Sequence, residues 1–199
     1  MGRPKASSID EATRERLLGA AARAFGSSGF NGARLEDIAA DAGIRRSSLL
    51  YHFDSKQTLY TAVLEHAFGE LERRMEITMA SADSFEARHQ SLVEGMIAFE
   101  HEHQPLLQVL MRSLLDHDES SAALLERSFV PLVDRIEHFM RVGAGDALPA
   151  NFPVRAAILQ QIVGHLVRSA MGAAGEMLWR GEAHSWTLAQ ALLRGATRP

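Results

Sequence analysis

The segment covering residues 35–53 constrains the fold of this chain more than any other. Its first part carries four apolar residues at the i, i+3, i+4, i+7 spacing of one helix face, namely Leu35, Ile38, Ala39 and Ala42. Gly43 follows directly and suits the left-handed conformation that ends a helix. A second short helix is expected over residues 46–52, with Leu49 and then Phe53 on its buried side. Two short helices joined by a tight glycine turn form the helix-turn-helix pattern.

The free face of the second helix carries basic and hydroxyl side chains. In a helix-turn-helix this helix enters the DNA major groove. Arg46 is the predicted base reader, since its guanidinium fits guanine O6 and N7. Leu50 suits a thymine methyl group, and Tyr51 suits a phosphate. Ser47 lies on the same free face of the helix, and Arg45 is expected to contact a phosphate.

Positive charge concentrates at the start of the chain, although the 199 residues have a net charge of −4. Residues 1–60 hold nine Lys/Arg and seven Asp/Glu, whereas residues 61–199 hold twelve and eighteen. Arg34 and Lys56 add to the cluster around the motif. Lys56 stands in the first turn of the next helix, where a phosphate would offset its repulsion by the helix dipole. This asymmetry favours a DNA-binding region joined to an acidic one.

The first sixty residues resemble the DNA-binding domain of the tetracycline-repressor (TetR) family. The resemblance rests on Leu17, Ala20, Ala21, Phe25, Gly29, Phe30, Ile38, Ala39, Ala42, Gly43, Leu49, His52, Phe53, Lys56 and Leu59. It implies an all-α chain with a three-helix DNA-binding domain over residues 1–54, called the head below. Residues 55–199, called the body, would form a helical effector-binding and dimerisation domain. Ser48 and His52 match family positions at the DNA.

The chain departs from the family's pattern at the entrances of both short helices. Ala33 and Arg34 stand where family members have Thr or Ser, so no hydroxyl is expected to cap the first helix. Arg45 replaces a frequent Ser, and Leu50 a frequent Tyr. We expect Arg34 to reach a phosphate by length and charge.

The N-terminal tail holds two cations beside a proline, Arg3 and Lys5. One interpretation is an arm that reaches the minor groove or the phosphates. The other is a solvated tail without a role. The capping-box pattern Ser8 to Glu11 predicts that the first helix begins at Ser8.

The body reads as a series of helices around an effector cavity. The apolar residues expected to line it are Met75, Met96, Phe99, Leu107, Met111 and Phe129. The polar residues expected to orient a ligand are His138, Gln161 and His165. The alternative for each apolar residue is ordinary core packing.

In the TetR family the last two helices pair with their copies in a dimer. The resemblance therefore implies an interface formed by Ile158, Ile162, His165, Ser169, Gly172, Trp186, Ala189 and Leu193. The alternative is packing within one chain. A twofold dimer would present two recognition helices to a palindromic operator.

The sequence gives little support for metal binding, cofactor binding or catalysis. The chain has no cysteine. His101 and His103 lack the spacing of a helical metal site, and no nucleophile elbow or phosphate-binding loop occurs. We therefore expect no metal, no cofactor and no enzyme. Without an apolar signal or membrane-spanning run, we expect a cytoplasmic protein.

These patterns predict a transcriptional regulator, more specifically a repressor released from a palindromic operator by a small, mainly apolar effector. The alternative is a helical ligand-binding or protein-interaction module without specific DNA binding. Ala33, Arg34 and Leu50 keep that alternative open.

Overall fold

The computed structural model describes residues 6–80, 84–116 and 119–179, and every regular element among them is helical. The predicted all-α fold is thereby confirmed. The α-helices in chain order are α1 (Ala6–Gly32), α2 (Leu35–Asp41), α3 (Arg46–His52), α4 (Lys56–Met79), α5 (Phe85–Glu102), α6 (Gln104–Asp116), α7 (Glu119–Leu124), α8 (Val130–Ala144), α9 (Val154–Met171) and α10 (Ala173–Trp179). A π-helical turn, η1 (Leu125–Phe129), joins α7 to α8, and a 3-10 turn, η2 (Gly145–Ala147), follows α8.

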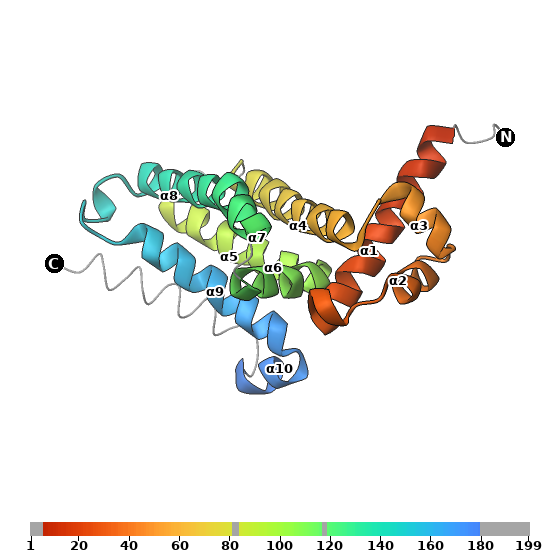
Figure 1. Ribbon diagram of the computed structural model, residues 1–199. Helices are drawn as coiled ribbons and strands as arrows, with labels where there is room; N and C mark the ends of the chain where they lie inside the picture. The colour runs from red at the N-terminus through yellow and green to blue at the C-terminus, as the bar shows by residue number, and fades with distance from the viewer. Residues whose placement is uncertain (1–5, 81–83, 117–118, 180–199) are drawn as a thin grey trace.

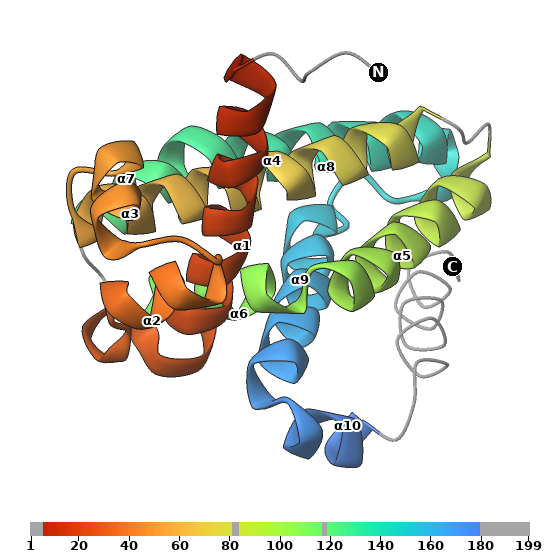
Figure 2. The same cartoon turned by 90° about the vertical axis from the view of Figure 1, so that its right-hand side faces the viewer.

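The helices α2 and α3 lie at one end of the molecule, beside α1 (Figure 1). The helix α1 packs against α2, α4 and α6, so it contacts both the head and the body. In the body, α9 lies among α5, α6 and α8 (Figure 2). None of the described helices combines the length and apolar character that crossing a membrane requires.

The sequence predicts the first helix from Ser8 to about Ser27, and α1 differs from these bounds at both ends. It already includes Ala6, so Ser8 does not begin it. At its far end Gly29 has φ 71° and ψ 174°, which interrupts the helix without ending it. Phe30 then returns to the core, where it stacks on Phe25 at 6.1 Å and meets the Tyr60 ring edge-on at 5.2 Å. The head core therefore includes a residue of α4.

The second half of the chain shows two helix interruptions. The sequence predicts a helix that is kinked or restarted at Pro131, and in the structure the π-helical turn η1 lies just before the proline. The sequence also predicts one helix over about residues 154–179, but this helix is divided at Gly172, whose φ of 54° is unfavourable for other residues. A last helix, predicted over about residues 185–195, lies outside the described residues.

Candidate nucleic-acid interface and ligand cavity

The turn between α2 and α3 has the predicted geometry. Gly43 adopts φ 71°, and its N–H donates to the Ala40 carbonyl at 3.0 Å. The N–H of Ile44 donates to the Ala39 carbonyl at 2.9 Å. These bonds satisfy the last carbonyls of α2 and direct the chain into α3.

The helix α3 is anchored along one side and exposed along the other. Leu49 and Phe53 are buried in the head core. Tyr51 is 83% exposed. The exposed face also carries Arg45, Arg46, Ser47 and Ser48. Leu50, expected to point outward, is only half exposed because it packs partly on the core.

The remaining head residues divide between exposed and engaged positions. Arg34 makes no side-chain capping bond at α2, as predicted, and Arg45 makes none at α3. Both side chains are exposed. The His52 side chain is largely buried, with its Nδ1 3.5 Å from an Asp10 carboxylate oxygen. Arg3 and Lys5 lie outside the described residues.

Two predicted DNA-contacting cations already have partners within the chain. The Arg46 Nε lies 2.9 Å from Oε1 of Glu36 on α2. The Lys56 Nζ donates to the Asn31 carbonyl at 3.3 Å and lies 4.8 Å from the Phe30 ring centroid. Sequence reasoning identified both cations but neither partner, because the partners come from other helices.

A cavity of about 90 Å³ lies in the body between α4, α5, α8 and α9. Four of the residues expected to contact a ligand line it: Met75, Met96, Gln161 and His165. Sequence reasoning missed most of the wall, including Leu71, His89, Val93, Ile136, Leu148, Phe152 and Val154. His89 had the clearest available signal, a histidine within an apolar helix.

The other expected ligand residues lie elsewhere. Leu107 and Phe129 line a second, smaller hollow of about 10 Å³. Phe99 is fully buried and Met111 partly buried, and neither lines these two cavities. His138 is exposed on α8, so its expected place in the cavity wall is wrong.

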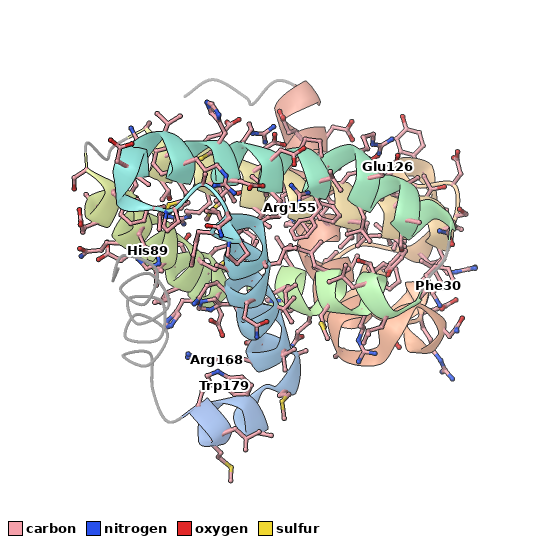
Figure 3. All side chains as sticks on the ribbon, turned by 90° about the vertical axis from the view of Figure 1, so that its left-hand side faces the viewer. Phe30, His89, Glu126, Arg155, Arg168 and Trp179 are labelled. Carbon is pink, nitrogen blue, oxygen red and sulfur yellow. The ribbon has the colours of Figure 1, made fainter. Side chains whose placement is uncertain are left out.

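Among the described residues, those that line the cavity include no carboxylate, ammonium or guanidinium group. Burial lowers the pKa of His89 to about 4, so this imidazole is neutral at pH 7. Behind the wall, Nδ1 of His165 lies 2.8 Å from Oε2 of the buried Glu100 carboxylate. Arg168 Nε lies 3.3 Å from the other Glu100 oxygen. Figure 3 shows His89 far from Phe30 of the head.

The residues expected at a dimer interface point mostly into their own chain. Ile158 and Ile162 line the cavity. Ser169 is buried and donates to the Gln104 carbonyl at 3.4 Å. Gly172 lies in the bend before α10. Trp186, Ala189 and Leu193 lie outside the described residues.

The face of α9 that carries Ile158, Ile162 and Ser169 therefore packs within its own chain. The opposite face is exposed and weakly polar. It carries Ala156, Gln160, Val163 and Ala170. Among the described residues, no group of three or more His, Asp or Glu side chains is placed to hold a metal ion.

Comparison with known proteins identifies the head. Residues 17–63 match the model of bacterial regulatory proteins of the tetR family. The transcriptional regulator RutR of Escherichia coli K12 is 47% identical over 60 residues, which cover 30% of this chain and 28% of RutR. The transcriptional repressor NicS of Pseudomonas putida is 34% identical over 74 residues, 36% of this chain and 35% of NicS. The chain thus spans about a third of the length of the curated relatives it matches.

The likeness to solved structures extends over the body as well. The regulator FadR of Bacillus subtilis, solved in complex with stearoyl-CoA, aligns with a TM-score of 0.70 over 92% of this chain and 97% of its own, at 12% identity. At that identity the likeness shows the fold alone. Residues 17–63 thus match the DNA-binding domain of the tetR family, and the chain as a whole shares the all-helical fold of FadR.

Proposed function

We propose that this chain is a cytoplasmic, homodimeric transcriptional regulator, and more specifically a repressor that a small effector releases from a palindromic operator. The observation that carries the proposal is α3. Its back is buried through Leu49 and Phe53, while two arginines, two serines and Tyr51 face solvent. A helix that presents hydrogen-bond donors on its exposed face at one end of the molecule suits the major groove.

The homodimer is supported by the exposed face of α9. Val163 and Met171 are 45% and 41% exposed, and Ala156 and Ala170 share this face. Small apolar side chains at helical spacing allow a second helix to approach closely. A twofold dimer through α9 would place two heads on two half-sites.

An uncharged effector suits the cavity. Its wall is apolar apart from Gln161, His165 and His89. An anion would lose its hydration there without gaining a cation in the wall, which is unfavourable. FadR holds stearoyl-CoA, a large anionic molecule. We propose a smaller, neutral and mainly apolar effector for this chain, placed by one or two hydrogen bonds.

The test is selection of duplexes from a library randomised over about two helical turns, at about physiological salt, where non-specific binding is weak. We expect one palindromic motif to be enriched by the purified full chain. The control is the Arg45→Ala/Arg46→Ala double variant, which should enrich no motif. A folded wild-type protein that selects no motif would contradict the proposal and favour a module without specific DNA binding.

A further inference from the structure

The ion pair between Glu36 and Arg46 places an acid beside the predicted base reader. Glu36 is the second residue of α2 and Arg46 the first residue of α3, and the two helices pack against each other. Glu36 Oε1 lies 2.9 Å from Arg46 Nε, with the side chains 63% and 55% exposed. An ion pair this exposed contributes little to stability. Its presence on the DNA-facing side therefore needs another explanation.

The atoms through which Glu36 and Arg46 meet determine which donors of the guanidinium remain available to DNA. A guanidinium has five N–H donors in a planar fork, and the approach of Glu36 recorded in the structure is at Nε. Its two Nη groups remain for a base edge, where guanine O6 and N7 accept two parallel hydrogen bonds. A carboxylate on Nε restricts rotation of the guanidinium plane before DNA arrives, which lowers the entropy lost on binding.

The same carboxylate opposes indiscriminate binding. It offsets one positive charge beside the phosphates, and non-specific affinity depends on the number of phosphates that cations neutralise. An arginine held by an acid is also less able to turn toward the nearest phosphate. Glu36 would thus reduce binding to random DNA while preserving the base contact of Arg46.

We propose that Glu36 is a positioning residue that sets sequence selectivity through Arg46. The proposal rests on the proposed function, since it requires that the head reads DNA. It assigns no contact with DNA to Glu36 itself. The base preference that Glu36 supports should occur once in each half-site, at the base pair that Arg46 reads.

A matched control lies one residue further along. Asp37 occupies the same first turn of α2 and is exposed, and no ion pair joins it to another described residue. Glu36→Gln and Asp37→Asn therefore remove the same charge from nearly the same place. Only Glu36→Gln also releases Arg46.

The experiment compares duplex selection by the wild-type chain, Glu36→Gln, Asp37→Asn, Arg46→Ala and the Glu36→Gln/Arg46→Ala double variant, using one randomised library and one salt concentration. Both single acid variants should bind random DNA more tightly. Glu36→Gln should lower the preference for one base pair per half-site by about fivefold or more, because a bidentate arginine contact distinguishes bases by roughly that factor. Asp37→Asn should change that preference by less than about twofold.

The double variant separates action through Arg46 from any other effect. Adding Glu36→Gln to Arg46→Ala should change no base preference further. Equal motifs from Glu36→Gln and Asp37→Asn would overturn the positioning role while leaving the proposed function intact. A wild-type chain that selects no motif would overturn both. Thermal unfolding of each variant, expected to match the wild type, confirms that folded proteins are compared.

Discussion

His89 is a side chain whose protonation is changed by burial in the body. It belongs to α5 and contributes an imidazole to an otherwise apolar cavity wall. Burial is the cause of its pKa falling to about 4. A neutral imidazole keeps one donor and one acceptor nitrogen, which suits an uncharged ligand. The charged form would be costly in this wall.

This shift predicts a pH-dependent stability. Unfolded His89 titrates near 6.5 and folded His89 near 4, so the unfolded chain binds more protons between these values. The contribution of neutral His89 to the free energy of unfolding is therefore complete above about pH 6.5. It is lost progressively as the pH falls towards 4. The free energy of unfolding, measured in urea, should decrease between pH 7 and pH 5. This decrease should be smaller for His89→Gln than for the wild type, by about 1 kcal/mol after allowance for partial exposure.

The exposed His138 on α8 provides the control for that measurement. His138→Gln should leave the loss of stability between pH 7 and pH 5 unchanged. A wild-type loss that His89→Gln does not reduce would show that other groups control the acid response.

Arg45 carries a second prediction at the residue scale. Its side chain is exposed, and none of the described carboxylates forms an ion pair with it. Because a phosphate contact carries no sequence information, Arg45→Ala should weaken binding to every duplex alike. The slope of log K against log salt should fall in magnitude by about 0.9. Arg73→Ala on α4 is the control, and an altered motif with Arg45→Ala would instead indicate base reading.

Single residues were predictable where one helix determines their environment. Leu49 and Phe53 follow from periodicity, as does the exposure of Arg46. Their partners were not predictable, since Glu36 reaches Arg46 from another helix. Leu50 shows the limit of the periodic argument, because a short helix turns its flank partly into the core.

At the scale of elements, α1 and α6 form the closest connection between head and body. The Arg112 guanidinium donates to the Gly26 carbonyl at 2.8 Å and to the Ser27 carbonyl at 3.0 Å. A Cβ at Gly26 would lie 3.0 Å from the Pro105 carbonyl oxygen, so glycine permits the close approach. Gly29, with positive φ, lies over the same arginine.

Loss of this arginine should weaken the connection measurably. Arg112→Ala leaves two carbonyls of α1 without their charged donor, which should cost about 1–2 kcal/mol in the free energy of unfolding. Arg127→Ala is the matched control, because it removes an exposed ion pair with Glu65 and should cost about 0–0.5 kcal/mol. Urea unfolding measures both, and equal losses would contradict a special role for Arg112.

Helices were easier to predict than the interruptions between them. Gly43 was predictable because an apolar face stops directly before it. Gly172 was not, since apolar and small residues continue on both sides of it. The π-turn of η1 leaves no signal in composition, because it depends on how α7 and α8 pack.

For the whole molecule, the proposed dimer requires one side of α9 to be free. The cavity occupies one side, and its wall combines four helices with a loop. That combination explains why most of the wall was missed. Helix periodicity locates an apolar face but not the element that covers it. Ile158 and Ile162 were expected at an interface and instead contact the cavity.

The exposed side of α9 predicts the oligomeric state. Val163→Glu places a charge in the proposed interface and should shift the protein to monomers at micromolar concentration by analytical ultracentrifugation. Ile77→Glu, at another exposed apolar residue on α4, should leave the dimer intact. A wild-type protein that sediments as a monomer would exclude this interface.

The π-turn before Pro131 also determines how the cavity tolerates changes in chain length. In η1 the Val130 N–H bonds to the Leu125 carbonyl, five residues back, so this turn holds one residue more than an α-helical turn. Deleting one residue here would give a regular α-helix with little rotation of α8, because the five residues of the π-turn cover about the same rotation as four α-helical residues. Ile136 and Met140 would then still face the cavity. The turn therefore absorbs the extra residue, and relatives that lack it can build this wall from the corresponding positions.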